Sequence, residues 1–178
     1  RLGAILARAR ESDDRMERVN ATAILLLILT GCRMGEILGL QWSDVKGNRL
    51  LLRGSKTGPR TVWLGDEARA LVQALPREGS NPWLFWNWRF KKPIRNLGHV
   101  WDRYRNEVGL KNVHLHDLRH TFASHAVMGK ENLAMVGKLL GHALPETTAR
   151  YAHLADDAVS DAARRVCGSI AAKLGMSS

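Results

Sequence analysis

The stretch "HLHDLRHTFASH", residues 114–125, carries two histidines four positions apart, with an acid and an arginine between them. We expect a helix over residues 116–128. Residues three or four apart lie on the same face of a helix, so His116 has Arg119 and His120 as neighbours. The stretch therefore presents either two ligands for a metal ion or a cationic pair for a phosphate.

The first interpretation is a zinc site. His116 and His120 would be ligands one turn apart, with Asp117 where zinc proteases carry a glutamate base. Asp117 is one methylene shorter than that glutamate, and Arg119 brings a cation close to the metal. A third ligand has to come from elsewhere, and His142 is the only attractive candidate. A zinc hydrolase is therefore an alternative with little support.

The second interpretation is a phosphate site. The guanidinium of Arg119 offers a planar fork of donors that matches phosphate oxygens. The imidazole of His116 beside it can donate a hydrogen bond or transfer a proton. A histidine and an arginine often meet by chance on a surface, so the rest of the chain has to decide.

The charge of the chain favours a polyanionic partner. Its 178 residues, enough for one domain, include 27 Lys and Arg against 17 Asp and Glu, a net charge of +10 and a pI near 10.3. The stretch "WNWRFKKPIRN", residues 86–96, is a basic patch and a candidate contact to a DNA backbone, although a solvated face explains it about as well. Its basic residues are Arg89, Lys91, Lys92 and Arg95.

Two further features indicate a cytoplasmic protein. Cys32 and Cys167 form no disulfide framework and fit a reducing compartment. The apolar run "AILLLILTGC", residues 23–32, is too short to span a bilayer and is typical of a buried helix.

Hydrophobic periodicity and turn residues predict a mainly α domain with one small antiparallel sheet, an α+β fold. We expect a β-hairpin at residues 49–64, whose strands flank a Gly-Pro turn. The expected helices cover residues 15–30, 33–40, 65–75, 94–108, 116–128 and 133–140, and an Ala-rich helix runs to about residue 174.

Two stretches before the opening one also carry cationic residues at structural boundaries. "TGCRMGEILGLQWSD", residues 30–44, places Arg33 just past a helix-ending glycine, with Glu36 one turn later on the same face. "GSKTGPRTVWL", residues 54–64, places Lys56 in the turn of the hairpin.

A third stretch follows the opening one. "LLGHALPETTARYAHL", residues 139–154, places His142 directly after a helix-ending glycine and Tyr151 shortly beyond. The order Arg, Lys, His-x-x-Arg, His and Tyr resembles the catalytic domain of the tyrosine recombinase (phage integrase) family. The resemblance covers about residues 20 to 153. It favours the phosphate site over the zinc site.

The resemblance implies a site-specific recombinase or integrase that cleaves and rejoins DNA without metal, ATP or other cofactor. Tyr151 is the implied nucleophile, which forms a 3′-phosphotyrosyl intermediate. His116 is the candidate proton acceptor for Tyr151. Lys56 is the candidate general acid toward the leaving 5′-oxygen.

The same resemblance implies a clamp for the phosphate. Arg33 and Arg119 hold the non-bridging oxygens, and His142 donates a further hydrogen bond. Glu36 orients Arg33 as a supporting partner. His120 is usual in the family's motif, but we interpret it as a buried, hydrogen-bonded histidine without a catalytic role.

The implied partner is double-stranded DNA at attachment or recombination sites, bound by a homotetramer, with accessory DNA-bending or directionality proteins and no membrane. Residues 1–178 are expected to be the catalytic domain alone, without the N-terminal DNA-binding domain usual in the family. The C-terminal helix or tail, residues 155–178, packs on its own domain or docks on a neighbouring protomer. Alternatives are a type IB topoisomerase-like enzyme and a non-catalytic DNA-binding protein of the same fold.

Overall fold

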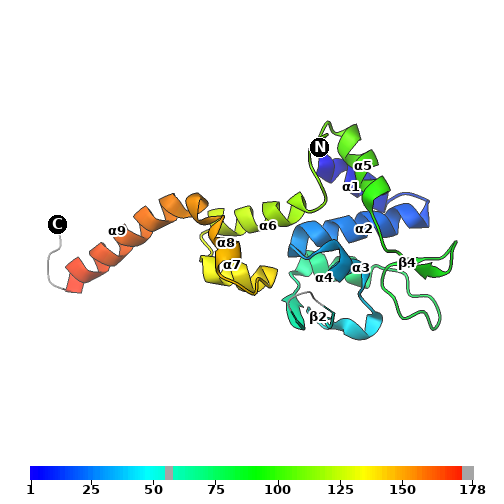
Figure 1. The fold of residues 1–178 in the computed structure, drawn as a ribbon, viewed down its shortest axis with the longest axis horizontal. Helices are drawn as coiled ribbons and strands as arrows, with labels where there is room; N and C mark the ends of the chain where they lie inside the picture. Colours follow the sequence, from blue (N-terminus) through cyan, green and yellow to red (C-terminus); the bar gives the residue numbers. More distant parts are fainter. Residues whose placement is uncertain (55–57, 174–178) are drawn as a thin grey trace.

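The structure of the chain, a computed structural model, describes residues 1–54 and 58–173, with the backbone alone at 155–159 and 172–173. Within these residues the protein is mostly helical, with two small antiparallel sheets (Figure 1). The predicted fold class is therefore confirmed. The elements are α1 (Leu2–Arg10), α2 (Arg15–Thr30), α3 (Met34–Leu38), η1 (Trp42–Asp44), β1 (Val45–Lys46), β2 (Arg49–Leu52), β3 (Arg60–Trp63), α4 (Asp66–Gln73), β4 (Trp86–Asn87), β5 (Lys92–Pro93), α5 (Gly98–Glu107), α6 (Asp117–Met128), α7 (Leu133–Leu140), α8 (Glu146–Ala149), η2 (Ala152–Ala155) and α9 (Asp156–Lys173).

Helix α2 is the centre of the main core, with α1, α4 and α6 packed against it. It begins where the Asp14 carboxylate accepts a hydrogen bond from the Met16 N–H at 2.8 Å, and it ends at Gly31 with φ +62°. Ile24 and Leu26 on this helix are completely buried. Each such side chain contributes roughly 1.5–3 kcal/mol, so the predicted apolar run holds the domain together.

The larger sheet contains both strands of the hairpin predicted at residues 49–64, and residues 55–57 between them lie outside the described part of the chain. In its antiparallel register Leu50 pairs with Val62 and Leu52 with Arg60. Leu50 and Val62 are buried, as strand alternation requires for the face turned to the core. Strand β1 adds a third strand that the sequence pattern did not predict.

Helix α5 begins four residues later than expected, at Gly98 instead of residue 94. The Ile94 N–H donates to the Phe85 carbonyl at 2.9 Å, which extends the pairing of the β4–β5 hairpin. The Asn96 side chain then accepts from the Gly98 N–H at 2.7 Å. Residues 94–97, which the apolar spacing assigned to the helix, are therefore outside it, because Ile94 pairs with the neighbouring strand and the helix begins only at Gly98.

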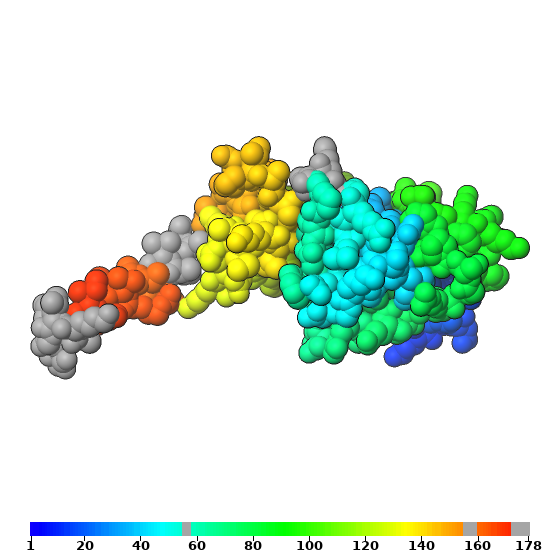
Figure 2. All heavy atoms as spheres, turned by 90° about the horizontal axis from the view of Figure 1, so that it is seen from below, coloured from blue at the N-terminus to red at the C-terminus, as the bar shows by residue number. Residues whose placement is uncertain are grey.

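A second, smaller core joins α6, α7 and the segment before η2. Its buried members are Ala123, Val127, Val136, Leu140 and Tyr151. Beyond it α9 extends away from the body of the molecule (Figures 1 and 2). Val166 and Ile170 on α9 are 57% and 52% exposed, so the structure does not pack this part of the helix on its own domain.

Candidate active site

Arg33 lies at the turn between α2 and α3 and is held there by Glu36. The Arg33 N–H donates to Glu36 Oε2 at 2.8 Å, and Arg33 Nη1 donates to Oε1 at 3.1 Å. The glutamate satisfies a free backbone donor at the helix start while it orients the guanidinium. The structure thus brings together the pair that the sequence placed one turn apart.

Arg119, at the start of α6, is buried between the ends of two helices. Its Nη1 donates to the carbonyl of Gly31 at 2.6 Å, and its Nη2 donates to the carbonyl of Leu140 at 2.9 Å. These carbonyls end α2 and α7, where helices leave acceptors unpaired and carry partial negative charge. Burial, then the nearby positive charge of Arg33, lowers the pKa of Arg119 to about 10, so it stays protonated at neutral pH.

His116 precedes α6 and is exposed as a residue, but its ring is partly shielded. The ring centroid lies 5.1 Å from that of His120, with the planes almost perpendicular. Loss of water around the ring, then the charges of His120 and Arg119, lowers the pKa of His116. At neutral pH the ring is therefore neutral and able to accept a proton.

His142 follows Gly141, whose φ of +68° ends α7. Its Nδ1 lies 2.7 Å from the hydroxyl oxygen of Thr148, a residue only 2% exposed. Burial, then the positive charges of Arg119 and Arg33, lowers the pKa of His142 to about 4. A neutral imidazole that accepts the Thr148 hydrogen at Nδ1 carries its own proton on Nε2, which leaves one donor for a phosphate.

Tyr151 is 6% exposed, and its hydroxyl oxygen lies 2.5 Å from Nδ1 of His120. Burial raises the pKa of the phenol, and the positive charges of Arg150 and Arg119 oppose that rise. We expected the phenol to face His116. The structure pairs it with His120 instead, because Tyr151 lies against the first turn of α6 and not against His116, which precedes the helix. His120 is hydrogen-bonded, as predicted, but it is half-buried and not fully buried.

The described candidates form a cluster at the ends of α2 and α7. The charges of Arg33 and Glu36 both act on Arg119, and those of Arg33 and Arg119 act on His142. Beside the cluster is a hollow of about 330 Å³, lined by Cys32, Met34, Asn96, His114, Leu115, His116 and Arg119. Lys56 lies outside the described residues.

Two residues of this neighbourhood were not singled out from the sequence. Arg60 reaches Glu36 from β3, with Nη2 donating to Oε2 at 2.9 Å. Thr148 is the hydrogen-bond partner of His142. Both stand in the stretches quoted above, but no spacing rule tells which arginine or threonine of a stretch turns inward.

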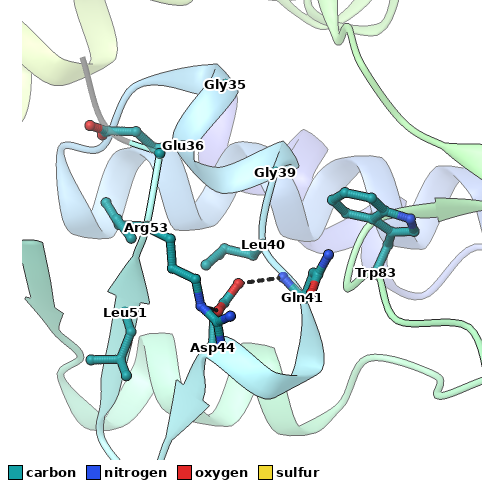
Figure 3. Close-up of a pocket in the computed structure, with 11 residues that line it drawn as sticks. Gly35, Glu36, Gly39, Leu40, Gln41, Asp44, Leu51, Arg53 and Trp83 are labelled. Carbon is teal, nitrogen blue, oxygen red and sulfur yellow. Dashed lines mark hydrogen bonds and ion pairs between the residues drawn. The ribbon is translucent and has the colours of Figure 1, made fainter. Parts of the chain in front are cut away.

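A separate hollow of about 250 Å³ lies between α3, η1 and β2 (Figure 3). Within it Arg53 Nε lies 2.7 Å from Asp44 Oδ1, an ion pair without hydrogen-bond alignment, and Asp44 Oδ2 accepts from the Gln41 N–H at 3.0 Å. Figure 3 shows Glu36 at its edge, with the carboxylate turned away from Asp44. The site cluster therefore uses the other side of α3.

The predicted basic patch forms the β4–β5 hairpin and the turn that follows it. All four of its basic residues, Arg89, Lys91, Lys92 and Arg95, are exposed. Aromatic rings support three of them, with cation-to-ring distances of 5.3 to 5.4 Å. Asn96, next along the chain, lines the hollow beside His116 and Arg119, so the patch is continuous with the candidate site.

The zinc interpretation finds no matching donor set. In the described part of the chain no three His, Cys, Asp or Glu side chains stand close enough to share a metal ion. His120, one of the two proposed ligands, points its Nδ1 at Tyr151. His142, the proposed third ligand, points its Nδ1 at Thr148.

Comparison with known proteins agrees with the phosphate interpretation. The Phage integrase family model matches residues 2–158. Tyrosine recombinase XerD of Brucella suis biovar 1 is 31% identical over 168 residues, which cover 84% of this chain and 53% of that protein. Tyrosine recombinase XerC of Pelobacter propionicus is 34% identical over 139 residues, 74% of this chain and 46% of that protein. The chain thus spans about half the length of the curated relatives it matches.

Solved structures share the fold. The Tn1549 transposon integrase in complex with circular intermediate DNA has a TM-score of 0.75 at 19% identity, over 92% of this chain and 64% of that chain. The XerH site-specific recombinase bound to palindromic difH substrate gives 0.71 at 25% identity, over 91% and 50%. The catalytic domain of bacteriophage HP1 integrase gives 0.64 at 26% identity, over 92% and 89%.

The fold is therefore that of a tyrosine recombinase catalytic domain. The chain belongs to the phage integrase family. Among residues 1–54 and 58–173, no helix combines the length and the apolar character needed to cross a bilayer.

Proposed function

We propose that this chain is the catalytic domain of a site-specific DNA recombinase, which cuts and rejoins double-stranded DNA through a 3′-phosphotyrosyl intermediate. The observation that carries the proposal is the cationic cluster of Arg33 and Arg119 with neutral His142 beside them. Such an arrangement suits a phosphodiester, whose non-bridging oxygens gain charge in the transition state.

In the proposed reaction the Tyr151 oxygen attacks the scissile phosphorus and its proton passes to a neutral imidazole, for which we keep His116. The bond from phosphorus to the 5′-oxygen breaks, and Lys56 supplies the proton of the new 5′-hydroxyl. Arg33, Arg119 and His142 bind the non-bridging oxygens. In the reverse step a 5′-hydroxyl attacks the phosphotyrosine, so no cofactor is needed. The contact of Tyr151 with His120 means that the phenol must leave this histidine to reach DNA.

The proposed DNA contacts extend from the cluster along the basic hairpin. The exposed side chains of Arg89, Lys91, Lys92 and Arg95 bind backbone phosphates on one side of the scissile position. The overall charge of +10 supports a polyanionic partner, and the XerH structure is a complex with a DNA substrate. DNA as the substrate also leads us to propose a site of action in the bacterial cytoplasm, on the nucleoid.

We further propose that residues 1–178 act as one catalytic domain within a homotetramer on two synapsed DNA sites. The C-terminal helix, from residue 155 onward, docks on a neighbouring protomer in this assembly. The exposed Val166 and Ile170 support the docking, because an apolar stripe left in water is costly. DNA-bending or directionality proteins are further proposed partners.

Recombination is favoured over the topoisomerase and the non-catalytic alternatives because the two curated relatives compared above are named tyrosine recombinases. The test uses supercoiled plasmids that carry two, one or no candidate recombination sites. A recombinase yields rearranged products only from the two-site plasmid. Relaxation of the plasmid without a site, at the same rate, would indicate a topoisomerase. Binding without any change in the plasmids would indicate a non-catalytic protein.

A further inference from the structure

Arg60, the first residue of β3, sends its side chain into the candidate active site. The side chain is 11% exposed. Its Nη2 donates to Glu36 Oε2 at 2.9 Å and lies 3.6 Å from Cys32 Sγ, and its Nη1 donates to the carbonyl of Leu139 at 3.0 Å. Arg60 therefore joins β3 to α3 and α7. Its contact on α3 is the site residue Glu36, and its contact on α7 lies three residues before His142.

Packing alone does not explain a guanidinium in this place. A buried charge is costly unless it is paired, and the Nε–H of Arg60 is buried with no acceptor among the described residues. A methionine would fill similar space without that cost. The partner of this cation is the carboxylate of Glu36, which is only 6% exposed. We therefore look to Glu36 for the reason that an arginine stands here.

Glu36 forms ion pairs with two arginines, whose side chains differ in how tightly they are held. Its Oε1 accepts from the guanidinium of Arg33, and its Oε2 accepts from Arg60 and from the backbone N–H of Arg33. The side chain of Arg33 is 30% exposed, so it is free to turn toward a phosphate, whereas Arg60 is also tied to the Leu139 carbonyl. Arg60 therefore stays on Glu36 Oε2 when Arg33 exchanges a carboxylate oxygen for a phosphate oxygen.

Arg60 also supports the end of α7. A Cβ atom at Gly141 would overlap Arg60 Cδ, so the arginine packs directly against this glycine. On either side of Gly141 stand the Leu140 carbonyl that binds Arg119 and the residue His142. A shift of the Arg60 side chain therefore removes the packing that holds both the Leu140 carbonyl and His142 in place.

We propose that Arg60 is a positioning residue of the strand-transfer reaction. It keeps Glu36 in place while Arg33 binds the phosphate, and it fixes the end of α7 beneath His142. This inference rests on the proposed function, but the contacts it depends on belong to the free protein.

The first test measures those contacts without DNA. The guanidinium Nε–H signals of Arg33 and Arg119 are assigned in ¹⁵N-labelled protein through single Arg→Lys variants. In Arg60→Met we expect both signals to shift or broaden, and in Arg60→Lys a smaller change. Arg49→Ala, an exposed arginine at the other end of the same strand pair, is the matched control and leaves both signals in place. Unchanged signals in a folded Arg60→Met protein would overturn the proposal.

The second test compares single-turnover cleavage of two nicked DNA substrates, one with an ordinary scissile phosphate and one with a methylphosphonate there. The methyl group removes the negative charge that the arginines bind. Arg60→Met should cleave the phosphate substrate roughly tenfold to a hundredfold more slowly than wild type, with a much smaller deficit on the methylphosphonate. Equal deficits on both substrates would show a general loss of structure and overturn the positioning role.

Where Arg60→Met does not fold, Arg60→Lys takes its place in both tests, because it keeps the charge but lacks the planar fork of donors that joins Glu36 Oε2 to the Leu139 carbonyl. If wild type cleaves neither substrate, the proposed function fails, and the Nε–H signals alone decide whether Arg60 positions Arg33 and Arg119.

Discussion

The hydroxyl oxygen of Tyr151 lies 2.5 Å from Nδ1 of His120, inside the smaller core of the domain. The two residues stand 31 positions apart in the chain, with His120 in α6 and Tyr151 in the turn between α8 and η2. The proposed nucleophile is therefore covered and paired in the protein without DNA, one helical turn away from His116.

This contact should appear as a coupling energy. Tyr151→Phe, His120→Leu and the double variant form a cycle, and we expect the free energies of unfolding to deviate from additivity by about 1 kcal/mol. His120→Leu leaves a buried phenol without its partner and should cost more than Tyr151→Phe. Chemical denaturation measures all four proteins. Additive effects would mean that the hydrogen bond is not made in solution.

The pKa of His142 predicts a pH dependence of stability. In the folded chain it is lowered to about 4 from an ordinary 6.5, so between these values the unfolded chain binds more protons. Stability therefore rises with pH across this window, is fully present above about 6.5, and is lost as the pH falls toward 4. His142→Gln should flatten the free energy of unfolding against pH there. His116, whose pKa is also lowered, keeps part of the slope. An unchanged slope would contradict the assignment.

Gly141 and Gly47 offer a matched pair for the packing of Arg60. Both have positive φ, +68° and +62°, so an alanine is strained at either. A Cβ at Gly47 meets nothing within 4 Å, whereas at Gly141 it meets Arg60. Gly47→Ala should cost about 1 kcal/mol of unfolding free energy, and Gly141→Ala clearly more. Equal losses, measured by denaturation, would show that Arg60 gives way freely.

The basic hairpin should contribute to DNA affinity through charge alone. Replacing Arg89 and Lys92 by glutamine should lower the slope of log affinity against log salt concentration by about 2 for duplex DNA, without changing sequence preference. Arg8→Gln with Arg10→Gln removes the same charge from exposed positions of α1 and serves as control. Fluorescence anisotropy over a salt series measures both. The same loss in both doubles would indicate a diffuse field instead of a contact surface.

Elements set by local chemistry were predictable from the sequence. The expected helices at 15–30 and 133–140 coincide with α2 and α7, because each is followed by a glycine in the left-handed conformation. The predicted start of α5 was wrong. Ile94 pairs with Phe85, a contact between strands that helical spacing in the sequence does not report.

The site shows the same division. Glu36 stands in the first turn of α3, three positions after the N-cap residue Arg33, so their contact followed from spacing. The partner of Tyr151 depends on how the chain returns to α6 after α8, which no local pattern encodes. The role of Arg60 could not be predicted for a related reason. Strand alternation assigns each residue to a face of the sheet, but it does not say what a long side chain contacts from the end of a strand.

The measurement that tests the central claim most directly is trapping of the covalent intermediate. A nicked DNA with a candidate site loses its 5′ leaving strand after cleavage, so the adduct accumulates. Wild type and Tyr151→Phe are incubated with it in EDTA, resolved on a denaturing gel and mapped by mass spectrometry. We predict a protease-sensitive protein–DNA band in wild type alone, with the nucleotide on Tyr151. An equal band in Tyr151→Phe, or a nucleotide on another residue, would contradict the account.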